Sequence, residues 1–109
     1  MDDEYKVEYL VLNDGSCPFE EWINHLADKI ARVYVFKRIE RIRRGNFGDC
    51  KSITSDISEF RIDFGPGYRV YFSMRKLTAI EIICAGTKKT QVRDIRKAKM
   101  LWETYKNAY

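Results

Sequence analysis

The chain has 109 residues, of which 45% are hydrophobic and 33% charged, and its formal net charge is +4. This composition predicts one globular domain over residues 1–109 and excludes a disordered chain. No apolar run approaches the ~20 residues of a membrane-spanning helix, and the acidic N-terminus lacks the pattern of a secretory signal. We therefore expect a cytoplasmic protein with no membrane partner. Three widely spaced cysteines and one histidine predict neither a disulfide framework nor a metal site, and no cofactor is expected.

The first part of the chain predicts one strand and two helices. Residues 4–12 alternate apolar and polar side chains, which is typical of a strand. A turn follows, and Ser16 is then expected to cap a helix whose apolar residues recur at helical spacing. After a short break near residues 27–29, a second helix is predicted from about residue 30 to residue 44, with Gly45 as its stop. Two helices joined this closely are expected to pack as an antiparallel hairpin.

Residues 59–72 predict a β-hairpin around the turn Gly65-Pro66-Gly67. Strict alternation on both sides of the turn gives an apolar face, which we expect in the core, and a polar face, which we expect to be the working surface. If Phe64 pairs with Tyr68 across the turn, Arg61 lies opposite Tyr71 and Asp63 lies opposite Arg69. The apolar face consists of Phe60, Ile62, Phe64, Tyr68, Val70 and Phe72.

A third strand is predicted at residues 78–85, ended by Gly86, and Thr90 is expected to cap a last helix that runs to about residue 106. Short loops join the last three strands, so they should form an antiparallel meander. The expected fold class is α+β with the order β-α-α-β-β-β-α and the helices packed on one face of the sheet.

Charge is distributed unevenly along the chain. Residues 1–31 are acidic, whereas residues 32–51 and 88–99 are basic. Such asymmetry favours an anionic partner near the basic segments, and a solvated helix face is the alternative.

Four segments of the chain match a known protein family in their order and spacing. Through these segments the chain resembles, from about Tyr5 to Trp102, the addiction-module killer proteins, which are HigB-like members of the RelE/ParE toxin superfamily. The segments are Arg44-Gly45-Asn46-Phe47-Gly48-Asp49 with Lys51, Glu59-Phe60-Arg61-Ile62, Gly65-Pro66-Gly67-Tyr68-Arg69-Val70-Tyr71-Phe72, and Gly86-x-Lys88-x-Thr90-Gln91 with Asp94-Ile95 and Ala98.

This resemblance implies a RelE-like fold and a type II toxin. Such a toxin is a small endoribonuclease that cuts messenger RNA, usually on the ribosome. It is silenced by a cognate antitoxin, for which we expect a helix-turn-helix protein. The expected partners are therefore mRNA, the ribosome and that antitoxin.

Metal-independent RNA cleavage uses the ribose 2′-hydroxyl as nucleophile and needs positive charge around the phosphate. His25 is the only histidine, so a histidine pair is excluded, and lysines, arginines and tyrosines must carry out any RNA cleavage. Arg61 and Arg69 are predicted to hold the scissile phosphate, because their planar guanidinium groups match phosphate oxygens. The resemblance implies that Lys88 contributes as general acid or transition-state cation. The general base stays open.

Each of these three predictions has a plainer alternative. Arg69 could form a cross-strand ion pair with Asp63, Arg61 could stack on Tyr71, and Lys88 could be a solvated loop lysine. Glu59 and Glu81 could also neutralise the two arginines. Gln91 and Asp94 are expected to orient the lysine or to cap the last helix. Further RNA contacts are predicted from Tyr71, which could stack on a base or bind phosphate through its hydroxyl, and from Lys89, Arg41, Arg43, Arg44, Lys51 and Arg93.

Three functions are consistent with these residues. The first is an mRNA endonuclease that inhibits translation. The second is a ParE-like protein that inhibits DNA gyrase by binding. The third is a non-catalytic module of the same fold that binds RNA or an antitoxin.

Overall fold

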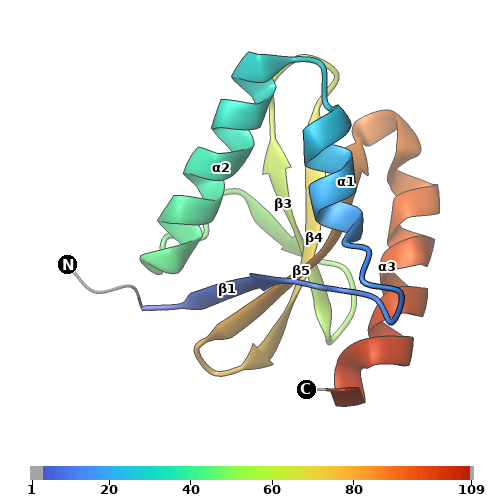
Figure 1. Cartoon of the computed structure of the whole chain (residues 1–109). Helices are drawn as coiled ribbons and strands as arrows, with labels where there is room; N and C mark the ends of the chain where they lie inside the picture. The colour runs from blue at the N-terminus through green and yellow to red at the C-terminus, as the bar shows by residue number, and fades with distance from the viewer. Residues whose placement is uncertain (1–3, 109) are drawn as a thin grey trace.

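The structure, a computed structural model, describes residues 4–108 (Figure 1). The α+β class and the predicted order of elements are confirmed, with one short strand added. The added strand, β2, lies in a segment that was predicted to be a loop. The prediction missed it because three residues are too few to show an alternating pattern. The elements are β1 (Lys6–Tyr9), α1 (Pro18–His25), α2 (Lys29–Arg43), β2 (Cys50–Ser52), β3 (Ile57–Ile62), β4 (Tyr68–Lys76), β5 (Ala79–Thr87) and α3 (Gln91–Tyr105), with 3-10 turns at Lys88–Thr90 and Lys106–Ala108.

The five strands form one mixed sheet in the order β1-β5-β4-β3-β2. Strands β3, β4 and β5 make the predicted antiparallel meander, and β2 extends it by pairing antiparallel with β3. Strand β1 pairs in parallel with β5, a pairing that the long intervening chain permits. Among residues 4–108, no helix is both long and apolar enough to cross a membrane.

The register of the β3–β4 hairpin differs from the predicted one. Ile62 pairs with Tyr68, so Arg61 lies opposite Arg69 and Glu59 lies opposite Tyr71. The loop takes up residues 63–67, because Gly65 and Gly67 both adopt positive φ angles, 56° and 79°. Compared with the predicted register the pairing shifts by two residues, which leaves every side chain on its predicted face and changes only its neighbours.

Helices α1 and α2 lie on the same side of the sheet (Figure 1). The apolar face of the hairpin packs against them, which confirms the predicted core. Its centre is completely or almost completely buried: Phe60, Val70, Phe72 and Ile82 from the sheet, with Phe19, Ile23, Val35, Ile39 and Ile42 from the two helices.

Helix α3 packs on the opposite face of the sheet, which corrects the prediction that all helices lie on one face. Strands β4 and β5 are apolar on both sides, so Tyr71, Ile83 and Cys84 form a second core with α3. Gly86 permits the close approach of α3, since a Cβ at this position would overlap the Asp94 carboxylate. The helix contributes Ala98, Leu101 and Trp102 to this core.

Candidate functional site

Arg61 on β3 and Arg69 on β4 lie directly opposite each other, on the sheet face where α3 packs. The backbone N–H of Arg61 donates to the Asp49 carbonyl on the β2 side, at 2.9 Å. The two arginines therefore form a non-hydrogen-bonded pair across β3 and β4, the arrangement in which facing side chains come closest. Like charges in this position repel, so the pair favours a negative group nearby.

Glu59 supplies that negative charge to one arginine only. Its carboxylate is completely buried and lies 3.0 Å from Nε of Arg61. Gln91, at the start of α3, donates from Nε2 to both Glu59 oxygens at 3.1 Å. Gln91 therefore orients the Glu59–Arg61 pair rather than the lysine. Glu59 was not predicted as a site residue, but it was predicted as an acid that could neutralise the arginines, and the structure confirms this for Arg61.

Arg69 makes no ion pair within residues 4–108. Its Nη1 donates to the Tyr68 carbonyl at 3.2 Å, and its Nε is buried without a hydrogen-bond partner. The alternative pairing with Asp63 is absent, because the observed register places Asp63 in the loop beyond β3. A partly buried guanidinium with an unused donor, beside a second arginine, is well suited to bind an anion.

Lys88 is held beside Arg69 by the turn of the hairpin. Its backbone N–H donates to the Gly67 carbonyl at 2.8 Å. Gly67 adjoins both side chains, since a Cβ on it would lie 3.5 Å from Cβ of Lys88 and 3.9 Å from Nη1 of Arg69. The structure thus brings Arg61, Arg69 and Lys88 together at one end of the sheet face. The side chain of Lys88 is exposed, as a group that meets a substrate must be.

Two threonines fix the turn that carries Lys88. Thr87 and Thr90 form a reciprocal capping box around the 3-10 turn. The hydroxyl of Thr90 also donates to Oδ2 of Asp94 at 2.5 Å. Thr90 is the N-cap residue of α3, as predicted, but its side chain makes no cap hydrogen bond to that helix. Asp94, which is almost completely buried, positions this turn.

Tyr71 does not fit the predicted role of stacking on a base. Its ring is completely buried under α3, and its hydroxyl has no hydrogen-bond partner among the described residues. Burial, followed by the charges of Glu59 and Asp94, raises the pKa of this hydroxyl far above its usual 10.0. Tyr71 is a neutral core residue, because the long α3 covers a face that the hairpin pattern alone left open.

Three of the remaining predicted RNA-binding cations lie near the arginine pair. Lys51 on β2 is in register with Glu59 and is exposed at the outer edge of the same sheet face. Lys89 and Arg93 are exposed at the start of α3, which follows Lys88. Nε of Arg93 lies 3.5 Å from Oδ1 of Asp94, so this arginine is already paired with an acid. Lys51 and Lys89 therefore extend the positive surface, and the charge of Arg93 is partly neutralised.

The other three predicted cations lie elsewhere. Arg41, Arg43 and Arg44 are at the end of α2, which packs on the opposite face of the sheet. Arg43 is also paired with Glu40 at 3.1 Å. The structure therefore does not place these three arginines with Arg61 and Arg69.

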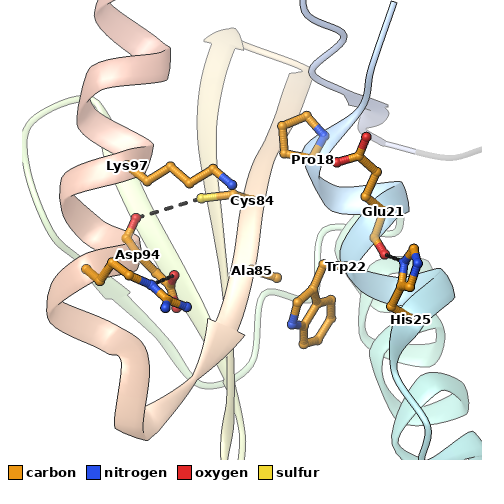
Figure 2. A pocket seen from close by; sticks show the side chains of 9 residues that line it. Pro18, Glu21, Trp22, His25, Cys84, Ala85, Asp94 and Lys97 are labelled. Carbon is orange, nitrogen blue, oxygen red and sulfur yellow. Dashed lines mark hydrogen bonds and ion pairs between the residues drawn. The ribbon is translucent and has the colours of Figure 1, made fainter.

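A cavity of about 640 Å³ lies between α1 and α3, beside β5 (Figure 2). Its lining mixes acids and cations, and Figure 2 shows Trp22 facing Ala85 across the opening and Lys97 reaching toward Cys84. The predicted residues Arg93 and Asp94 line it, but neither Arg61 nor Arg69 does, so the cavity and the arginine pair are separate features. The described residues include no cluster of three or more His, Cys, Asp or Glu side chains that could hold a metal ion.

An uncharacterized protein of Haemophilus influenzae (strain ATCC 51907 / DSM 11121 / KW20 / Rd) is 42% identical to the chain over 83 residues. The match covers 76% of this chain and 84% of that protein. The chain belongs to the same family as this protein. No family model matches the chain, and no solved structure matches it.

Proposed function

We propose that the protein is a RelE/HigB-like toxin of a type II toxin-antitoxin system, an endoribonuclease that cuts mRNA in the cytoplasm. One observation supports this proposal above the others. Arg69 is a partly buried cation with an unused donor and no acidic partner within residues 4–108, and it lies between Arg61 and the segment that carries Lys88. The expected partners are translated mRNA on the ribosome and an antitoxin of the helix-turn-helix class.

The chemistry assigned to this site is attack of a ribose 2′-oxygen on the adjacent phosphorus. A P–O2′ bond forms and the P–O5′ bond breaks, leaving a 2′,3′-cyclic phosphate and a 5′-hydroxyl. Arg69 binds the non-bridging oxygens, whose charge increases in the transition state. Lys88 donates a proton to the leaving 5′-oxygen. The 2′-hydroxyl proton passes to solvent, because the buried Glu59 already accepts hydrogen bonds from Arg61 and Gln91.

A non-catalytic module that binds RNA is the second candidate. One observation favours it: Glu59 already neutralises Arg61, so Arg69 alone of the two arginines keeps its full charge for a phosphate. A ParE-like gyrase inhibitor is the third reading, and the same experiment distinguishes it.

The test is to induce the protein in bacterial cells and to map the 5′ ends of translated mRNAs by primer extension. The wild-type protein should arrest growth and produce new cuts. Arg69→Ala and Lys88→Ala should each reduce cleavage about 100-fold or more, because each removes charge stabilisation of the transition state. Lys99→Ala, an exposed cation elsewhere on α3, is the matched control and should cut normally.

Other outcomes would contradict parts of the proposal. RNA binding by the purified protein without any cleavage would support the second candidate. Intact transcripts with blocked gyrase supercoiling would support the ParE-like reading. If both Arg69→Ala and Lys88→Ala stayed fully toxic, the assignment of Arg69 and Lys88 to the active site would be wrong.

A further inference from the structure

Apart from Lys29 at its start, the first half of α2 carries apolar side chains on its solvent side as well as on its core side. Ile30, Val33, Tyr34 and Phe36 form what we call the outer α2 patch, and these side chains are 59%, 50%, 40% and 40% exposed. Spacings of three and four residues make Ile30 a neighbour of Val33 and Tyr34, and Val33 a neighbour of Phe36, on the helix surface. The solvent side of a surface helix is ordinarily polar, and contiguous exposed apolar side chains mark interaction sites.

The second half of the same helix is basic on its exposed side. Lys37 and Arg41 follow the patch along α2, and Arg44 follows directly after the helix. The one acid there, Glu40, is already paired with Arg43. Lys37 and Arg41 form no ion pair within the described part of the chain. Lys37 and Arg41 line a cavity of about 280 Å³. Tyr34 of the outer α2 patch also lines this cavity, so the cavity and the patch are adjacent. The surface is therefore apolar at one end and positively charged at the other.

We infer that the outer α2 patch binds an acidic amphipathic helix of a partner protein. Apolar residues of that helix, spaced at i, i+3 or i+4 and i+7, would lie on Val33 and Phe36, and its carboxylates would face Lys37 and Arg41. This pairing buries the apolar side chains and neutralises the two cations at once.

Two other occupants fit the surface less well. A second copy of the chain also carries a net charge of +4 and the same exposed cations on α2. Two copies joined through this surface would therefore repel each other. A nucleic acid would neutralise Lys37 and Arg41 but would place phosphates against Ile30, Val33 and Phe36. The inference goes beyond the proposed function and does not depend on it, since Arg61 and Arg69 lie on the opposite face of the sheet.

The probe is a fluorescein-labelled helical peptide of about 20 residues, with leucines at the spacing above and glutamates elsewhere. Its binding to the purified full chain is measured by fluorescence anisotropy. Val33→Ser combined with Phe36→Ser should weaken binding about tenfold or more, because it removes the apolar anchors. Leu77→Ser, which removes an apolar side chain that is 92% exposed at the β4–β5 turn, is the matched control and should bind normally.

The charge of the partner is tested separately. Replacing the glutamates of the peptide by lysines should weaken binding about tenfold, since only the acidic peptide attracts the basic end of α2. Lys37→Glu should weaken binding of the acidic peptide, whereas Lys99→Glu on α3 should leave it unchanged. Circular dichroism and thermal unfolding of each variant verify the fold, and because all these positions are exposed they should match the wild type.

Four results would overturn the inference. They are failure of the wild-type protein to bind the acidic peptide, equal binding by the Val33→Ser/Phe36→Ser variant, a wild-type dimer in sedimentation that this variant converts to a monomer, and loss of binding to a labelled single-stranded RNA in this variant. Loss of RNA binding in Arg69→Ala alone concerns the proposed function instead, so the two failures are distinguishable.

Discussion

At the scale of single residues, two arginines in equivalent strand positions meet different environments. Arg61 has a buried carboxylate at 3.0 Å, whereas Arg69 has a buried Nε with no partner. The difference arises from Glu59, which is two positions from Arg61 on the same strand and is fixed by Gln91 from α3. A single buried acid thus separates a structural arginine from one that is open to an anion.

Cys84 gives a prediction for alkaline pH. Burial, reinforced by Asp94 and opposed by Lys97, raises the pKa of its thiol from 9.0 to about 12. Above pH 9 the unfolded chain has lost a proton that the folded protein keeps, so this group makes stability fall as pH rises toward 12. At pH 10.5 the loss from this thiol is about 2 kcal/mol.

The check is urea unfolding of wild type and Cys84→Ala at pH 7 and pH 10.5. At pH 7 the variant should be less stable, because the substitution leaves a small cavity in the second core. At pH 10.5 the difference should shrink or reverse, since alanine has no proton to lose. An equal difference at both pH values would contradict the assigned pKa.

At the scale of elements, α2 begins where a specific cap allows it. Oδ1 of Asp28 accepts hydrogen bonds from the backbone N–H groups of Ile30 and Ala31, at 3.0 and 3.1 Å. The predicted break at residues 27–29 is therefore the N-cap itself, and the helix ends at Arg43 with Gly45 beyond it at φ 86°. Local sequence is sufficient to place both ends, because caps depend on residues within one turn.

Asp28→Ala should destabilise the protein by about 1 kcal/mol, because two N–H groups at the start of α2 lose their acceptor. The measurement is the free energy of unfolding in urea. Asp63→Ala, which removes an exposed loop acid, is the matched control and should change it by less than about 0.5 kcal/mol. Equal effects of the two substitutions would show that the cap contributes nothing.

At the scale of the whole molecule, Arg38 links α2 to the sheet. Its guanidinium donates to the carbonyl of Arg61, and to those of Phe47 and Asp49 at 3.1 and 3.2 Å. It also lies over the ring of Phe60, 5.2 Å from the centroid. One side chain therefore joins the helix, the following loop and the strand that carries Arg61.

Arg38→Ala should destabilise the protein by roughly 2–4 kcal/mol, since three carbonyls lose a charged donor. Arg38→Lys should recover only part of this, because an ammonium group cannot reproduce the planar fork. Urea unfolding is the measurement, with Lys37→Ala, the exposed neighbour, as control. Full stability of Arg38→Lys would show that charge alone, and not geometry, holds this junction.

The sequence by itself determined what depends on near neighbours. Alternation assigned Phe60, Val70 and Phe72 to the core, and helical spacing with Gly45 located the helices. The order of elements and the meander followed from short loops. The chemistry of the candidate cations was also readable, since a guanidinium keeps its charge in any fold.

Only the tertiary structure decided what depends on residues far apart in the chain. A register shift of two residues leaves every side chain on the same face of the sheet. The alternation of apolar and polar residues therefore could not decide whether Asp63 or Arg61 lies opposite Arg69. Strands β4 and β5 are apolar on both faces, so α3 packs on the face that was predicted to be the working surface. This packing buries Tyr71 and brings Gln91 within hydrogen-bond distance of Glu59. Which arginine is neutralised and which is open to an anion depends on these long-range contacts together with the local spacing of Glu59 and Arg61.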